Sequence, residues 1–435
     1  MRRPAAVLAA FVALFAFAAA QAPRAGRVVL VTIDGLRGDY LAPQDPWHLK
    51  IPALRRLIAG GSASDRTISV FPTLTGTAHT TLVTGVGAGR HGILGNNKFD
   101  PSVWAWGTDA YDAQPRYASH GDITAETLWT VAAGRRAVTA AVNWPQTAGG
   151  PITHRADFAA GRTADTILGP VTPADVRMAD HYRALVAAAL LVKMKPAFMA
   201  VHFSLTDSVQ HALGPGTPEA LVALEETDAN LAIVVDALRQ SESAAEATIV
   251  VTGDHGFLPL HTELAINLPL VEAGLITRGA DARPEWQAIV SPNRGLGSVY
   301  VKAGAPREPV AARAREALAG YAKRYPGRFR ILERAELDRW GADSNAVFGI
   351  EPMPGYVLDA RLEEPFAQAH ARAAGHGYSP DTPGMQTALV MAGAGIRRGV
   401  RLFETRSIDV APTIAALLGW PLPQAEGQPI AGALK

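Results

Sequence analysis

Cysteine is absent from the 435 residues of this chain. Its absence excludes disulfide bonds, a cysteine nucleophile and thiolate ligands, so a bound metal would have to be held by His, Asp and Glu side chains. A charge bias is also missing, because 41 basic and 40 acidic residues leave a net charge of +1. We therefore expect no nucleic-acid-binding surface and no bulk attraction to an anionic membrane.

Long apolar runs are missing except at the N-terminus. Arg2 and Arg3 precede an apolar stretch from Ala5 to Ala20, and Gln21-Ala22-Pro23 follows it. A positive start, a short apolar core and small residues at its end are typical of a secretory signal peptide, whereas a membrane anchor needs about 20 apolar residues. We expect residues 1–22 to be a signal peptide, with export to the periplasm or the cell exterior and no stable membrane anchor.

Beyond that run, predicted strands alternate with predicted helices. Five apolar runs are typical of strands buried inside a sheet: Val28–Ile33, Ala137–Val142, Ala197–Thr206, Ala247–Thr252 and Ala388–Met391. The helices expected with them are Pro52–Ala59, Pro173–Met194, one from Pro218 onward, Thr262–Gly274 and Asp409–Leu418. This alternation predicts an α/β fold with a mostly parallel central sheet covered by helices on both faces.

The pattern changes between about residues 280 and 371. Short strand candidates at Ser298–Lys302 and Tyr356–Asp359 flank a predicted helix at Pro309–Tyr325. Because the earlier alternation returns afterwards, we expect an inserted α+β subregion rather than a separate domain. The expected organisation is one catalytic domain at residues 26–435 that carries this insertion.

The stretch from Phe71 to Gly85 crowds hydroxyl groups behind Pro72 and predicts a short helix closed by Gly85. A helix N-terminus offers unpaired N–H groups that bind anions such as phosphate. A threonine alkoxide there, as at Thr75, could attack phosphorus if something lowered the pKa of its hydroxyl. Threonines at helix starts are more often caps. This stretch alone therefore favours the cap.

Three predicted strands end in an aspartate, at Asp34, Asp207 and Asp254. Because ligand sites in open parallel sheets lie outside the carboxyl ends of the strands, these carboxylates are expected to converge. Two of them have a histidine nearby: His255 is adjacent to Asp254, and His211 follows Asp207 by one helical turn if that loop coils.

A further histidine, His376, lies between glycines in Gly375-His376-Gly377-Tyr378. Together with the three aspartates, the other two histidines and Thr75, it makes a donor set that suits a pair of zinc ions. The alternative is that these are turn and cap residues whose convergence is accidental. Asp228, on the apolar face of the helix from Pro218, is expected to bond a neighbouring backbone rather than a metal.

The order of these motifs resembles the alkaline phosphatase superfamily, and within it the nucleotide pyrophosphatase/phosphodiesterases. The resemblance covers Val28 to about Trp420. The segments that carry it are Asp34-Gly35-Leu36-Arg37, Phe71-Pro72-Thr73-Leu74-Thr75, His91-Gly92-Ile93-Leu94-Gly95-Asn96, Asp207 with His211, Asp254-His255-Gly256 and Gly375-His376-Gly377-Tyr378.

The resemblance implies an alkaline-phosphatase-like three-layer fold and a two-zinc site. One zinc would be held by Asp207, His211 and His376. The other would be held by Asp34, Asp254, His255 and the Thr75 oxygen. Thr75 would be the nucleophile that forms a phosphothreonine, and Asn96 and the N–H of Gly76 would bind phosphate oxygens. A formylglycine sulfatase is disfavoured, because the position of the nucleophile, residue 75, holds threonine.

Two departures from the family bear on the substrate. Many family phosphodiesterases stack a nucleobase between a phenylalanine and a tyrosine at the positions of Gly76 and His202, and both of those residues are missing here. The loop Asn143–Thr147 lacks the cations that the related monoesterases place over phosphate, although Arg155 follows closely.

We therefore expect a phosphodiesterase that hydrolyses a phosphodiester or pyrophosphate bond in a small phosphorylated substrate. Nucleotides are among the possible substrates. A zinc-dependent phosphomonoesterase is the main alternative. A metal-binding protein without catalysis is a weaker one.

Overall fold

The computed structural model describes residues 25–100, 114–241, 244–281 and 283–435. The predicted signal peptide lies outside these residues, so export stays a prediction. Among the described residues, no helix combines the length and the apolarity that crossing a bilayer requires.

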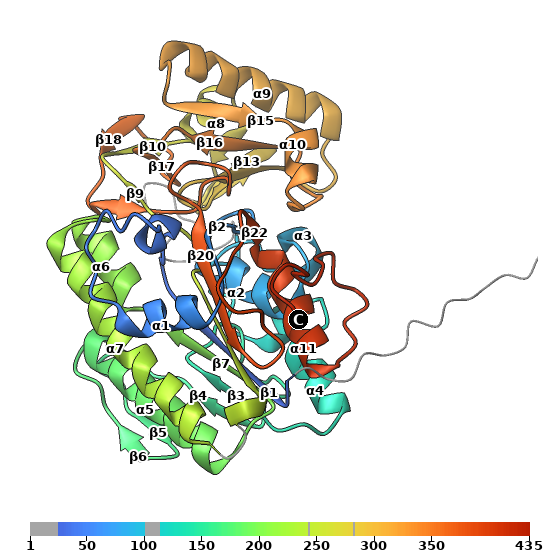
Figure 1. Ribbon diagram of the computed structural model, residues 1–435. Coiled ribbons are helices and arrows are strands. Elements are labelled where there is room, and N and C mark those ends of the chain that lie inside the picture. The colour runs from blue at the N-terminus through green and yellow to red at the C-terminus, as the bar shows by residue number, and fades with distance from the viewer. Residues whose placement is uncertain (1–24, 101–113, 242–243, 282) are drawn as a thin grey trace, which may run out of the picture.

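A nine-stranded sheet runs through the centre of the molecule (Figure 1). Its strands are β1 (Arg27–Ile33), β2 (Gly61–Ile68), β3 (Thr139–Val142), β4 (His154–Ala156), β7 (Phe198–Phe203), β8 (Ala247–Thr252), β20 (Thr387–Gly393), β21 (Val400–Arg401) and β22 (Thr405–Arg406). Their order is β21-β2-β20-β8-β1-β7-β3-β4, with β22 beside β2. The pairs β8-β1, β1-β7, β7-β3 and β3-β4 are parallel, and β20 runs antiparallel to both of its neighbours. The predicted mostly parallel sheet is confirmed.

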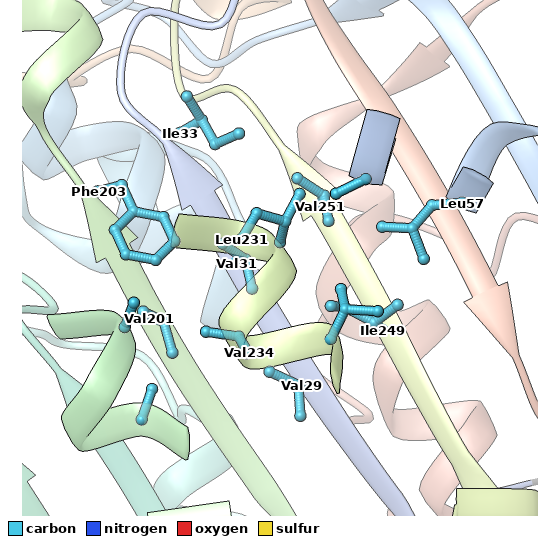
Figure 2. Packing of buried hydrophobic residues seen from close by; sticks show 14 of the residues in the cluster. Val29, Val31, Ile33, Leu57, Val201, Phe203, Leu231, Val234, Ile249 and Val251 are labelled. Atoms are coloured by element: carbon cyan, nitrogen blue, oxygen red, sulfur yellow. The ribbon is translucent and has the colours of Figure 1, made fainter. Parts of the chain in front are cut away.

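Helices cover both faces of this sheet because its central strands are apolar on both sides. Val29, Val31 and Ile33 of β1 belong to a core cluster with residues of α1 (Pro52–Gly60), α5 (Val176–Lys193) and α7 (Pro218–Gln240). Figure 2 shows these three side chains beside Leu231 and Val234 of α7. The alternate residues Val28 and Leu30 pack with α2 (Thr75–Thr84), α4 (Leu128–Gly134) and α11 (Val410–Leu418). The fold is therefore three-layered.

A smaller antiparallel sheet lies at one end of the molecule (Figure 1). It consists of β13 (Ala288–Pro292), β14 (Gly297–Val301), β16 (Phe348–Pro352) and β15 (Phe329–Leu332), in that order. Helices α8 (Leu268–Glu272) and α9 (Arg307–Arg324) contribute to its core. That core also takes in Leu264, Ile266 and Leu275, which precede residue 280. The insertion boundaries at about 280 and 371 stay a prediction.

Two expectations about local structure differ from the fold. The helix predicted over Thr262–Gly274 is a strand, β10 (Thr262–Ala265), followed by the short α8. β10 pairs in parallel with β17 (Tyr356–Asp359), a partner nearly a hundred residues away that local periodicity cannot reveal. Strand β2 was not predicted, because its serines, aspartate and arginine do not form an apolar run.

Two buried aspartates hold helices in place by capping them from neighbouring helices. Asp228 of α7 accepts hydrogen bonds from the N–H groups of Ala53 and Leu54, at 2.9 and 2.8 Å, at the start of α1. This confirms that it bonds backbone. Asp180 of α5 does the same for α6 (Leu205–Leu213), where it accepts from Leu205 N–H at 2.8 Å. The capped α6 carries two predicted zinc ligands.

Candidate active site

The carboxyl ends of β1, β7 and β8 bring the three predicted carboxylates together. Asp34 directly follows β1, and Asp254 lies two residues beyond β8. Asp207 lies in the first turn of α6, because β7 ends at Phe203 rather than at Thr206 as expected. The loop after β7 does coil, so His211 lies one helical turn beyond Asp207.

One group of possible metal ligands consists of Asp207, His211 and His376. Each offers one ligand atom, and these atoms all lie within 4.8 Å of one another. Asp207 Oδ1 is 3.4 Å from His211 Nε2 and 3.8 Å from His376 Nε2. This grouping matches the set that the sequence predicts for one zinc.

A second group lies beside the first and shares Asp207 with it. It consists of Asp34, Asp207 and His255, again within 4.8 Å. His255 Nε2 is 3.2 Å from Asp34 Oδ1 and 3.4 Å from Asp254 Oδ2, so Asp254 adjoins the group through this imidazole. The Thr75 hydroxyl is 3.2 Å from the same Nε2. All predicted members of the second set therefore meet around His255.

The donor atoms of these residues fit metal ions. Asp34 Oδ1, Asp207 Oδ1 and Asp254 Oδ2 are buried and accept no hydrogen bond from the described residues, although buried polar atoms normally find a partner. The three histidines bond a backbone carbonyl through Nδ1: His211 to Ala374 at 2.9 Å, His255 to Gly256 at 3.2 Å and His376 to Thr73 at 3.0 Å. A proton on Nδ1 leaves the Nε2 lone pair facing the carboxylates, as in metal-ligating histidines.

The electrostatics of the group favour positive charge at its centre. Burial raises the pKa of Asp254 to about 7, and the charge of Asp34 adds to the shift. The pKa of Asp207 is also raised, first by burial and then by Asp34. Burial opposes ionisation of Asp34 too, but the neighbouring imidazoles of His202 and His255 hold its pKa well below its ordinary value. Burial would lower the pKa of His255, yet the nearby carboxylates raise it to about 10. A metal cation can take the place of this proton.

Thr75 is the first residue of α2, and its hydroxyl does not cap the helix. The N-cap residue is Leu74, which makes no side-chain cap hydrogen bond. Its neighbour Thr73 is tied instead to the loop of His376: the Thr73 hydroxyl donates to Tyr378 O at 2.9 Å and accepts from Gly377 N–H at 3.1 Å. Thr75 thus lies beside the candidate ligand groups, and it lines a cleft at this edge of the sheet.

Asn96 lies at the N-terminus of α2, where its side chain occupies the Gly76 N–H that the family resemblance assigns to phosphate. Gly76 N–H donates to Asn96 Oδ1 at 2.7 Å. The expected contact of this N–H with a phosphate oxygen is therefore replaced by a bond that orients the amide. Asn96 is also among the residues that line the same cleft as Thr75.

Two other sequence-based expectations concern the walls of the cleft. His202 is buried, and its Nε2 lies 3.0 Å from Asp34 Oδ2, so this residue supports a predicted ligand rather than forming a stacking wall. Arg155 is exposed and pairs with Asp157 at 3.1 Å, and it is not among the residues that line the cleft.

Several site residues were missed at the sequence level. Buried His79 contacts Thr75 O through Nδ1 and the Thr32 hydroxyl through Nε2, each at 2.8 Å. Its spacing of four residues from Thr75 on a helix was the available signal. Arg116, Tyr117 and Arg372 also line the cleft, which has a volume of about 600 Å³. They lie in loops without a pattern that could have indicated them.

The sheet and its helical layers define an α/β protein with an alkaline-phosphatase-like fold. The murine ectonucleotide pyrophosphatase/phosphodiesterase 5 superposes with a TM-score of 0.69 at 18% identity, covering 92% of this chain and 97% of that one. The human counterpart gives 0.69 at 19% identity. The family model "Type I phosphodiesterase / nucleotide pyrophosphatase" matches residues 28–379, so the chain belongs to that family.

Relatives with curated names are distant. A pyrophosphatase/phosphodiesterase of Schizosaccharomyces pombe, itself uncharacterised, is 27% identical over 236 residues, which are 53% of this chain and 45% of that protein. The venom phosphodiesterase of Naja atra is 24% identical over 53% of this chain and 26% of its own length. The matches thus span half or less of these two proteins. A bis(5'-adenosyl)-triphosphatase of Xenopus laevis is 23% identical over 94% of this chain and 80% of its length.

Proposed function

We propose that this chain is a two-zinc phosphodiesterase that cleaves phosphodiester or pyrophosphate bonds of small nucleotide-like substrates. The reaction would pass through a phosphothreonine on Thr75. The observation that carries the proposal is the meeting of three unpartnered, buried carboxylate oxygens with three histidine Nε2 atoms and the Thr75 hydroxyl. Family membership supports the reaction class.

The family resemblance assigns the residues that would hold each metal, and the two groups bring most of them together. Asp207, His211 and His376 would hold one zinc, and Asp34, Asp254, His255 and Thr75 the other. Zinc bound in both places would supply Lewis-acid stabilisation of the attacking and leaving oxygens.

The chain itself would position the reacting groups. Thr75 Oγ1 would attack phosphorus as the bond to the leaving oxygen breaks, and water would then release the phosphoryl group from Thr75. Asn96, fixed by Gly76 N–H, would donate through Nδ2 to a non-bridging oxygen on which charge develops. His79 would hold the first turn of α2 through its bond to Thr75 O.

The cleft supports a small organic substrate. Its volume of about 600 Å³ falls within the range of about 300–1,000 Å³ that is usual for small-molecule sites. Tyr117 and Trp144 supply large aromatic side chains on its lining. A solved structure of an inactive variant of the murine neighbour contains AMP, and other relatives carry nucleotide substrates in their names, which supports a nucleotide-like ligand here.

A zinc phosphomonoesterase is the second candidate, and one observation favours it. Arg116 lines the cleft together with Asn96, so a cation does lie near the residue expected to bind phosphate. A dianionic monoester needs more neutralising charge than a monoanionic diester does. The exposure of Arg116 to solvent weakens its field at the phosphate, so the diesterase is favoured.

The deciding experiment compares bis-p-nitrophenyl phosphate with p-nitrophenyl phosphate, using zinc-loaded protein and chelator-treated protein. The diesterase predicts the larger kcat/KM for the diester and loss of activity with chelator. A larger value for the monoester would assign the second candidate.

Trapping of the intermediate tests the nucleophile. Acid quenching followed by mass spectrometry should locate the modification at Thr75, and Thr75→Ala should remove both the modification and turnover. Unchanged activity of Thr75→Ala would instead reject Thr75 as the nucleophile. A wild-type protein that binds zinc but turns over neither ester would be the non-catalytic metal-binding protein.

A further inference from the structure

A cavity of about 270 Å³ lies at the edge of the central sheet opposite the active-site cleft. β8 begins at Ala247, which lines this cavity, and Asp254 of the active site lies two residues beyond the other end of the strand. The 6 residues of β8, at about 3.3 Å each, place roughly 20 Å between the two. The cavity shares no lining residue with the cleft.

The floor of the cavity is apolar and belongs to the core between α1, α7 and the sheet. It consists of six buried side chains, Leu57, Val235, Leu238, Ala247, Ile249 and Ala392. Figure 2 shows Leu57 and Ile249 among the packed side chains of this core. Pockets for small organic ligands have such apolar linings, and their usual volumes begin at about 300 Å³. The cavity therefore suits a small organic ligand.

Three arginines from separate segments lie around this floor. Arg56 comes from α1, Arg239 from the last turn of α7 and Arg398 from the loop after β20. All three are exposed, and none of their guanidinium groups is paired with a carboxylate of the described residues. None of the described residues that line the cavity is acidic. Guanidinium groups in this situation are free to bind the oxygens of an anion.

The helix dipole does not account for this convergence. A basic residue in the last turn of a helix is favourable whether or not a ligand binds there, and Arg239 is in that position. The last turn of α1 contains no basic residue, so Arg56 lies outside it, and Arg398 is not in a helix. Two of the three arginines therefore have no such structural explanation.

A fourth guanidinium group lies on the same face of the sheet. Arg27 of β1 pairs with Ala247 of β8, and because side chains alternate along a strand it shares the face of Val29. Arg27 is 6% exposed, and its Nη1 has no hydrogen-bond partner among the described residues, although buried polar atoms normally have one. The carboxylate of Glu246, the residue before Ala247, lies beside Gly26 instead.

We propose that this cavity binds a small organic anion whose apolar body lies on the floor and whose charged head lies among Arg56, Arg239 and Arg398. Charge complementarity selects this class of ligand. A carboxylate, sulfonate or phosphate head satisfies the guanidinium groups, whereas a neutral or cationic head leaves them uncompensated. The site is independent of the function proposed above, because it needs neither zinc nor Thr75.

Hexane-1-sulfonate is a suitable probe, because it has a permanent negative charge, an apolar body and no phosphate that the active site could cleave. Calorimetric titration of the full-length protein should show one saturable site. Hexan-1-ol, which lacks the charge, and methanesulfonate, which lacks most of the apolar body, should each bind at least tenfold more weakly. Equal affinity for hexan-1-ol, or no saturable binding of hexane-1-sulfonate, would overturn the proposal.

Two substitutions locate the site without any need for turnover. Gly60 lines the cavity, and a Cβ there would meet nothing within 4 Å, so Gly60→Leu should narrow the cavity and weaken binding at least tenfold. The matched control is Gly134→Leu, where a Cβ also meets nothing and which should bind as the wild type does.

Arg398→Gln changes an exposed loop side chain, so it tests the charge even if Gly60→Leu fails to fold. It should weaken binding of hexane-1-sulfonate at least fivefold and leave binding of hexan-1-ol unchanged. Binding of hexane-1-sulfonate that survives Arg398→Gln and a folded Gly60→Leu at the wild-type level would place the anion elsewhere, as in the cleft with Arg116 and Arg372, and would overturn the proposal.

Discussion

The backbone N–H of Gly76 donates a 2.7 Å hydrogen bond to Oδ1 of Asn96, twenty residues further along the chain. Gly76 directly follows the proposed nucleophile, so this bond links the attacking residue to the amide that would stabilise the charge it creates. The bond also sets the direction of the amide, because Oδ1 accepts the Gly76 N–H and the proposed substrate contact falls to Nδ2. Two predictions follow from this pair.

Asn96→Ala should lower kcat by about 10²–10³ while KM changes little, because the amide would act mainly on charge that develops in the transition state. Steady-state kinetics on bis-p-nitrophenyl phosphate measure this. Zinc content should stay at the wild-type level, which is the control for folding. A rise of KM with unchanged kcat would show that Asn96 only holds the ground-state substrate.

Gly76→Ala should reduce kcat/KM by about tenfold or more, because a misplaced group in an active site costs up to about 10²-fold. A Cβ atom at this position would lie 3.0 Å from Gly95 O, 3.1 Å from Gln146 Nε2 and 3.2 Å from Asn96 Oδ1. The matched control is Gly134→Ala at the end of α4, where a Cβ would meet nothing within 4 Å. Wild-type activity in Gly76→Ala would mean that the Gly76–Asn96 hydrogen bond can shift without loss of catalysis.

Zinc should bind in two equivalents and stabilise the fold. Asp207 belongs to both ligand groups, so Asp207→Asn should lower the zinc content measured by elemental analysis and abolish turnover. At free zinc about 100 times its Kd, each site should raise the free energy of unfolding by about 2.7 kcal/mol, and a chelator should remove that gain. Asp165→Asn, at an exposed site, is the control. Full zinc content in Asp207→Asn would contradict the assignment.

Stability should fall in acid through His91. Burial lowers the pKa of this residue to about 3, and its Nδ1 accepts Ile93 N–H at 3.1 Å. A depressed folded-state pKa has no effect above the unfolded value of about 6.5; below it the unfolded chain takes up a proton that the folded chain does not. His91 should therefore cost about 1.4 kcal/mol per pH unit between pH 6 and pH 4.

Denaturant unfolding in chelator, at several pH values, measures this slope. His91→Gln removes the titrating group and should flatten the slope by about that amount. His48→Asn, which replaces an exposed imidazole, is the comparison. Equal slopes for wild type and His91→Gln would show that other buried groups carry the acid sensitivity.

The sequence predicted those parts of the fold and site that depend on apolar runs and on their ends. Strands β1 and β8 are evident directly from such runs. Parallel strands place their carboxyl ends at the same edge of a sheet, so Asp34 and Asp254 were expected to meet there. The turn of α6 that aligns His211 with Asp207 followed from a spacing of four. Local pattern suffices in these cases because burial on both faces leaves a clear compositional mark.

Other features depended on contacts that no local pattern encodes. Strand β2 is polar and is a strand because β20 pairs with it. Arg372 and His370 lie in an irregular segment, and only the folded chain places them beside His211. The sequence showed that His202 stands where relatives have a stacking residue, but it could not show that this ring contacts Asp34.

The hydrogen bond between His376 and Thr73 spans 303 residues and is accompanied by the two bonds of the Thr73 hydroxyl to the same loop. One proposed ligand of the first zinc and the loop that carries the proposed nucleophile are therefore joined late in synthesis. A ribosome that has made 370 residues has made β1, β7, β8 and Thr75, but neither His376 nor the strand β20 that joins β2 to β8. Hydrolytic activity should consequently switch on over the last portion of translation, and fragments that end before His376 should be inert however well they fold.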